Sequence, residues 1–137
     1  MATGAALALA EAQARGDRPG VEALLDPRYV NIDLRRGVRL RLEGDEAVDL
    51  HRLAASLSET RHERTPVAVR GDLLVLTRNR IRFVGSDADV GDAEVVSLAL
   101  TECSPDGRIV AQTVFDLDDT DRALAALDAR FEELERG

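Results

Sequence analysis

The stretch YVNID, residues 29–33, alternates polar and apolar side chains and ends on a carboxylate. A period of two is typical of a strand, and it places Tyr29, Asn31 and Asp33 on one side. A carboxylate that faces a cavity beside neutral polar groups can act as a general base. The stretch therefore raises a chemical question, which is whether Asp33 is a base in a pocket or the polar end of a strand.

Asp33 has two interpretations that the sequence alone leaves open. The first is a general base, with Gln112 or Asp116 as its partner from a later strand. Such a pair could support isomerisation, dehydration or epoxide opening. The second is an ion pair with Arg35 or Arg36, which follow it closely. Asp116 is open in the same way, because it stands either in the pocket or just before a helix cap.

The two histidines and the single cysteine carry weaker signals. His51 stands beside Arg52 on a charged helix, so we expect it on a solvated face. His62, next to Glu63 at the start of a strand, is expected to be structural. The histidines are too far apart for metal-ligand spacing, and Cys103 is expected to be an inert buried thiol. We therefore expect no metal and no cofactor.

Three arginines alternate along one expected strand, at Arg78, Arg80 and Arg82. Like charges cannot share a dry cavity without partners, so we expect these side chains on the outer face of a sheet. There they would pair with acids of a neighbouring strand or of a second subunit. Anion binding is the alternative.

The composition limits the class of protein. A chain of 137 residues, 45% hydrophobic and 32% charged, predicts one globular domain over residues 1–137. The net charge of −8 argues against nucleic acid and against anionic membrane surfaces as partners. The sequence shows no apolar run of membrane-spanning length and no signal-peptide pattern. Together with the lone cysteine and the use of arginine without lysine, this predicts a cytoplasmic bacterial protein.

Local signals mark the first elements. The Ala-rich residues 4–15 predict a helix that Gly16 ends. Asp17 is the expected N-cap of a second helix, which has Pro19 in its first turn and reaches to about Leu25. The next helical segment is residues 44–58, which follow an alternating ribbon or loop at 35–44. Its residues with the spacing of a core face are Val48, Leu50, Leu53 and Leu57.

The second half of the chain predicts four strands and a helix. The strands are expected at residues 61–70, 73–84, 93–103 and 108–117, and the last helix begins at the capping acids 118–121. The order is helix, helix, strand, helix and then four antiparallel strands. This order indicates an α+β domain with its helices on one face of a curved sheet.

Strand periodicity also selects the residues that would share a cavity with Asp33. The result is a mostly apolar pocket with a few polar groups, which is the usual make-up of a small-molecule site. The predicted pocket-lining residues are Tyr29, Asn31, Asn79, Phe83, Ser97, Ala99, Gln112 and Val114.

Four short motifs occur in the order found in one superfold. They are GD at 16–17, LLDPRYVNID at 24–33, GDEAV at 44–48 and DGRI at 106–109. In this order the chain resembles nuclear transport factor 2-like proteins, which include ketosteroid isomerases and SnoaL-like polyketide cyclases. The resemblance implies a cone-shaped roll, in which a curved antiparallel sheet wraps around N-terminal helices and a C-terminal helix follows. It also implies a pocket inside the cone and a homodimer formed through the sheet.

The resemblance carries over only part of the known catalytic sets. Asp33 falls on the general base of the isomerases, which removes a proton alpha to a carbonyl. Their two oxyanion donors fall on Leu9 and Ala99, whose side chains cannot donate a hydrogen bond. The acid of the cyclases falls on Val114, and Ser97 is the only polar residue at the positions of its partners.

Two functions follow from these observations. The first is a SnoaL-like domain that binds a small apolar molecule and dimerises, without the known isomerase or cyclase residues. Because residues 114–134 resemble SnoaL-like domains appended to larger bacterial proteins, this domain would be a module of a larger regulator. The alternative is a small cofactor-independent isomerase, cyclase or hydrolase. It would use Asp33 as general base on an apolar, polyketide- or terpenoid-like substrate, so the sequence leaves open whether the protein is an enzyme.

Overall fold

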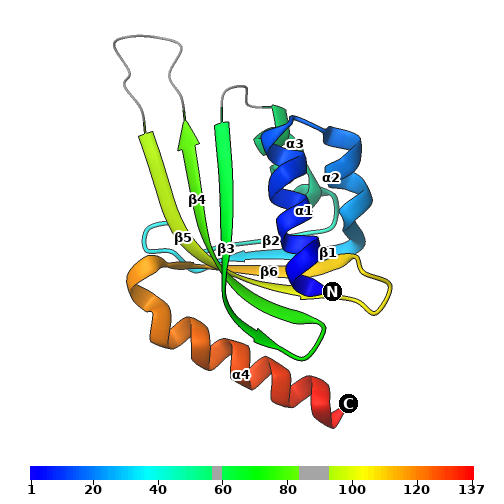
Figure 1. Ribbon diagram of the computed structural model, residues 1–137, viewed down its shortest axis with the longest axis vertical. Helices are drawn as coiled ribbons and strands as arrows, with labels where there is room; N and C mark the ends of the chain where they lie inside the picture. The colour runs from blue at the N-terminus through cyan, green and yellow to red at the C-terminus, as the bar shows by residue number, and fades with distance from the viewer. Residues whose placement is uncertain (57–59, 84–92) are drawn as a thin grey trace.

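A computed structural model describes residues 1–56, 60–83 and 93–137, without the side chains of residues 54–56, 60, 83 and 93. Figure 1 shows the arrangement of its elements. In chain order these are α1 (Ala2–Ala14), α2 (Arg18–Leu24), β1 (Leu25–Asp33), β2 (Leu40–Glu43), α3 (Asp45–Ser56), β3 (Thr60–Arg70), β4 (Leu74–Phe83), β5 (Ala93–Cys103), β6 (Ile109–Asp116), the 3-10 turn η1 (Leu117–Asp119) and α4 (Thr120–Arg136). None of the described helices has both the length and the apolar character needed to cross a membrane.

The strands form one six-stranded curved sheet in the order β2-β1-β6-β5-β4-β3 (Figure 1). Neighbouring strands are antiparallel except β1 and β6, which run parallel. The α+β class is therefore confirmed. The four long strands expected from the sequence agree with β3 to β6 to within one residue at each end.

Capping and turn residues explain the first boundaries. Gly16 ends α1 with a positive φ of 67°, a conformation that glycine adopts without a steric cost. The Asp17 carboxylate accepts a hydrogen bond from the backbone N–H of Gly20, 3.0 Å away, and so caps α2 as predicted. Pro27 disfavours a helical conformation at Asp26, and the chain enters β1 at Leu25.

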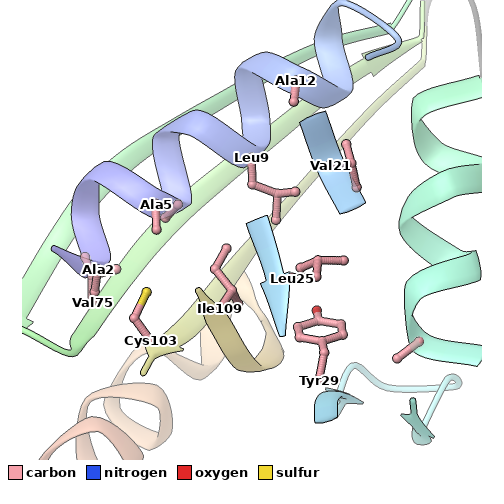
Figure 2. Close-up of a cluster of buried hydrophobic side chains, with 12 residues drawn as sticks. Ala2, Ala5, Leu9, Ala12, Val21, Leu25, Tyr29, Val75, Cys103 and Ile109 are labelled. Atoms are coloured by element: carbon pink, nitrogen blue, oxygen red, sulfur yellow. The ribbon is translucent and has the colours of Figure 1, made fainter. Parts of the chain in front are cut away.

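The helices α1, α2 and α3 cover the inner face of the sheet, and the larger buried cluster lies beneath them (Figure 1). Small alanines let α1 approach the strands closely, and Leu9 fills the space that remains (Figure 2). The ring of Tyr29 lies at the edge of this cluster, near Leu25 (Figure 2). The core therefore ends on one buried phenol, from which a polar network begins.

The last helix, α4, lies on the opposite face of the sheet, so the expectation that all helices share one face is wrong. Residues Leu74 and Leu76 alternate with the inward-facing Val75, and they point to the outer face. There they pack against Ala123 and Leu127 of α4 in a second buried cluster. Each leucine buried in this way contributes about 1.5–3 kcal/mol, which explains why α4 stays on this face.

The rest of the outer face carries the alternating arginines. Arg80 forms an ion pair of 2.6 Å with Glu94 of β5, and Arg82 lies 4.0 Å from the same carboxylate. The predicted pairing with acids of a neighbouring strand is therefore confirmed for these two. Arg78 is exposed on the same face.

Candidate functional site

A cavity of about 160 Å³ lies between the inner face of the sheet and the helices α1 and α3. Cavities of about this size, with apolar walls, can hold a molecule as large as benzene. Its lining residues come from seven elements and the loop after β1. They are Gln13, Asn31, Arg35, Leu50, His51, His62, Glu63, Arg64, Asn79, Arg80, Ile81, Val95, Ser97, Ala99, Gln112 and Val114.

Most of the residues that the sequence predicted for a pocket lie at this cavity. Six of them line it, namely Asn31, Asn79, Ser97, Ala99, Gln112 and Val114. Tyr29 lies one layer deeper, and its hydroxyl reaches two of the lining residues by hydrogen bonds. The side chain of Phe83 lies outside the described part of the chain.

A chain of buried hydrogen bonds runs along one wall of the cavity. The Gln13 amide Nε2 donates to His51 Nδ1 at 2.8 Å, so the proton of the neutral imidazole lies on Nε2. That proton is donated to the Tyr29 hydroxyl at 2.7 Å. Tyr29 in turn donates to Gln112 Oε1 at 3.0 Å, and Gln112 Nε2 donates to Thr101 Oγ1 at 2.9 Å. Each side chain between Gln13 and Thr101 in this series accepts one hydrogen bond and donates the next one.

Asn31 completes this network from the side. Its Nδ2 donates to the Tyr29 hydroxyl at 3.0 Å, so that the oxygen accepts two hydrogen bonds and its proton is donated to Gln112. The phenol has no capacity left for a ligand. A buried polar network that satisfies its own members is rigid, and here it holds the positions of Asn31 and Gln112.

Burial determines the protonation of the network. It lowers the pKa of His51 to about 3, and the positive charge of Arg64 acts in the same direction. Burial also raises the pKa of Tyr29 far above its usual value. Both side chains are therefore neutral at pH 7, and neither is suited to take up a proton in a reaction.

The expectation that His51 lies on a solvated face is wrong. His51 is only 6% exposed, whereas Leu50 and Leu53 of the same helix are 40% and 60% exposed. The helix turns its Ala47–His51 side inward, a spacing of i and i+4 that was present in the sequence. Among the other residues given core spacing, Val48 packs against the inner cluster and Leu57 lies outside the described part.

Arg64 is the second residue that the sequence analysis missed. It pairs in register with Asn79, so its side chain points to the inner face. The guanidinium Nη1 is inaccessible to solvent and has no hydrogen-bond partner. Burial lowers the pKa of Arg64 to about 10, which leaves the group charged at neutral pH. The period of two within residues 61–70 places His62 and Arg64 on one face of the strand. Both residues line the cavity, so this alternation was the signal that could have found Arg64.

Asp33 forms the ion pair that was the alternative to a catalytic role. Arg35 Nη2 lies 2.6 Å from Asp33 Oδ2, and Arg35 Nε donates to Oδ1 at 2.9 Å. The backbone N–H of Arg35 also donates to Oδ1. These bonds raise the pKa of Arg35. Arg35 lines the cavity, whereas Asp33 borders a separate hollow with Leu40 and Arg122.

Asp116 lies directly before η1 and bonds to the loop that follows β1. Its carboxylate accepts from the backbone N–H of Arg36 at 2.9 Å. The described residues contain one cluster of possible metal ligands whose atoms are close enough to share an ion. It consists of the carboxylates of Asp116, Asp118 and Asp119. Arg36 already contacts Asp116 and Asp118 with its side chain, so it offsets part of the negative charge of this group. No described hydrogen bond joins Asp33, Gln112 and Asp116 to one another.

The positions that the resemblance compared with isomerases and cyclases can now be located. Leu9 is fully buried in the inner cluster and contributes no polar atom to the cavity. Ala99 lines the cavity, together with Ser97 and Val114. Of these four residues, Ser97 alone has a side chain that can donate a hydrogen bond.

Solved structures with a similar fold include enzymes and binding proteins. SalBIII, an epoxide hydrolase/cyclase-like enzyme in pyran ring formation of the polyether salinomycin, is 14% identical with a TM-score of 0.68, over 82% of this chain and 88% of that one. An epoxide hydrolase of the LEH-like type from M. tuberculosis is 19% identical with a TM-score of 0.64, over 98% and 91%. A computationally designed 17-OHP binder is 17% identical with a TM-score of 0.67, over 85% and 92%. No protein-family profile and no curated protein matches the sequence.

These similarities define the class of fold. The chain has the nuclear transport factor 2-like fold of epoxide hydrolases and cyclases, which is the SnoaL-like architecture that the sequence resembled. At these identities it is the fold alone that is shared, so the function has to be argued from the cavity.

Proposed function

We propose that this protein binds a small, largely apolar molecule in the cavity between the sheet and the helices α1 and α3. One observation carries the proposal. The polar side chains along one wall bond to each other in a neutral, closed network, and apolar residues such as Ile81, Ala99 and Val114 form other parts of the wall. Such a cavity suits binding, because apolar wall surface combined with polar groups that are fixed in place is typical of ligand sites.

Catalysis by the same cavity has less support. A general base must be deprotonated near neutral pH and within reach of the substrate. His51 is held neutral but uses both ring nitrogens in hydrogen bonds, and Asp33 is bound by Arg35. A designed 17-OHP binder with a similar fold supports a binding role. These points favour a binding domain without the isomerase or cyclase residues.

A titration with small ring compounds tests binding. We expect cyclohexanol and benzyl alcohol to shift the amide NMR signals of Asn31, Ser97 and Gln112. Ala99→Leu should abolish these shifts, because the added side chain fills the cavity that Ala99 lines. Ala129→Leu on the exposed surface of α4 is the matched control and should leave them unchanged. Shifts that persist in Ala99→Leu would contradict the proposal.

The enzyme alternative keeps one supporting observation, which is the fold shared with SalBIII and an epoxide hydrolase. In that alternative Asp33 acts as the base on an apolar epoxide or unsaturated ketone. A panel of such compounds, assayed with the wild type and Asp33→Asn, tests it. Turnover that depends on Asp33 would favour the enzyme over the binding domain.

A homodimer formed through the sheet is a further part of the proposal. Because α4 covers the apolar part of the outer face, the interface would use the charged part. Glu63, Arg78 and Arg80 border a hollow there and offer charges of both signs to a second copy. Sedimentation equilibrium at about 100 µM protein tests this, and a monomer would contradict it. The role as a module of a larger bacterial regulator rests on the resemblance of residues 114–134 alone.

A further inference from the structure

The charge of Arg64 has no partner in the described part of the chain. Its Nη1 is buried without a hydrogen bond, and no ion pair joins its guanidinium to a described carboxylate. Removing a charge from water is costly unless an opposite charge or several hydrogen bonds replace the lost solvent. A cation that lines a cavity and has one buried, unpartnered nitrogen is therefore a suitable site for an anion.

The described acidic groups around the cavity do not supply that anion. Glu63 pairs in register with Arg80, so its side chain belongs to the outer face although it borders the cavity. Asp33 accepts three hydrogen bonds from the side chain of Arg35. Tyr29 remains a neutral phenol whose oxygen already accepts two hydrogen bonds. Within residues 1–56, 60–83 and 93–137 no carboxylate pairs with Arg64, so the cavity can take the missing charge from a ligand.

We propose that the cavity binds a small monocarboxylate, whose carboxylate pairs with Arg64 and whose hydrocarbon part contacts Leu50, Ile81 and Val95. This inference rests on the proposed binding function and adds the chemical class of the ligand. Arginine is suited to this role, since its planar fork donates two parallel hydrogen bonds to a carboxylate. The three apolar residues line the same cavity as Arg64.

The size of the cavity limits the ligand further. A volume of about 160 Å³ is enough for one six-membered ring. A single unpaired guanidinium balances one negative charge. Benzoate is therefore a suitable probe, and benzamide has nearly the same shape without the charge.

The experiment compares the two probes by amide NMR titration at constant ionic strength. We expect benzoate to bind at least tenfold more tightly than benzamide, with shifts at Asn31, Ser97 and Gln112. Arg64→Met should remove this difference. Arg18→Met deletes the same charge from the exposed surface of α2 and should keep it. Arg64→Met is also expected to fold, because it removes an unpaired buried charge rather than a bonded one.

The outcomes separate the two proposals. Equal affinity of benzoate and benzamide in the wild type would overturn the carboxylate inference and leave the binding function standing. A preference for benzoate that survives in Arg64→Met would also overturn it, because the charge would be recognised elsewhere. Absence of binding by both probes and by benzyl alcohol would overturn both proposals. The wild-type comparison needs no variant, so it decides the question even where a substitution disturbs folding.

Discussion

At the scale of single residues, Asp33 is best explained by its ion pair. The side chains of Asp33 and Arg35 are only 12% and 31% exposed, and they are joined by two short contacts. We expect Asp33→Asn to lower the free energy of unfolding by about 1–3 kcal/mol, because it leaves a partly buried guanidinium underpaired. Urea unfolding measures this.

Asp118→Asn is the control for that experiment. Asp118 also pairs with arginine, but its side chain is 64% exposed, so its loss should have a much smaller effect. If Asp33→Asn is as stable as the wild type or more stable, the charged carboxylate of Asp33 lowers the free energy of unfolding or leaves it unchanged. That result would strengthen the enzyme alternative.

His51 makes stability depend on pH. Its pKa is about 3 in the folded protein and about 6.5 in the unfolded chain, so the unfolded chain binds more protons between these values. The contribution of His51 is complete above pH 6.5 and is lost as the pH falls towards 3. The expected slope approaches about 1.4 kcal/mol per pH unit, the value for one proton.

His51→Gln isolates this effect, since every other titrating group stays in place. The stability of the wild type relative to the variant, from urea unfolding, should be larger at pH 7.5 than at pH 5. A difference that does not change with pH would mean that His51 becomes protonated in the folded state and that its burial is incomplete.

How much of the site could be predicted depended on the kind of signal. Period two in the strands placed Asn31, Ser97 and Gln112 on one face, and all three line the cavity, because a strand offers only two faces. The burial of His51 was not predicted, because a neighbouring arginine does not determine which side of a helix faces the core. The inward position of Arg64 was not predicted, because arginine is mostly found on protein surfaces. This side chain lies at a cavity wall only because the helices cover that face of the sheet.

At the scale of elements, α4 is held by its apolar stripe. Leu127 is fully buried between the helix and the outer face of the sheet. We expect Leu127→Ala to lower the free energy of unfolding by about 2–5 kcal/mol, through lost burial and the cavity left behind. Leu7→Ala on α1, where the residue is 37% exposed, should change it by less than about 0.5 kcal/mol. Similar effects at the two positions would contradict the packing of α4.

The face that α4 occupies could not be read from the sequence. The pattern of Leu124, Leu127, Phe131 and Leu134 indicates an amphipathic helix, but it does not say which surface the helix covers. That choice follows from β4 and β5, where Leu74, Leu76, Leu98 and Leu100 leave an apolar strip on the outer face. Both strands had been predicted, yet the strip was recognisable only once the inner face had been assigned.

At the scale of the whole molecule, the two cores share the same strands. Val75 packs into the inner cluster, while its neighbours Leu74 and Leu76 pack into the outer one. Loss of either cluster therefore exposes one face of β4. It also weakens the packing of the other cluster against the opposite face. A single cooperative transition follows from this arrangement, as is usual for a domain of this size.

Tyr29 makes this cooperativity measurable, because it is the only tyrosine and the chain contains no tryptophan. Its fluorescence reports the inner cluster, whereas circular dichroism at 222 nm also reports α4. We expect the two signals to give the same urea midpoint, both in the wild type and in Leu127→Ala. If α4 were an independent appendage, Leu127→Ala would shift the dichroism alone and leave the Tyr29 transition in place. Coincident transitions would mean that changes on the outer face reach the cavity, because both depend on the same strands.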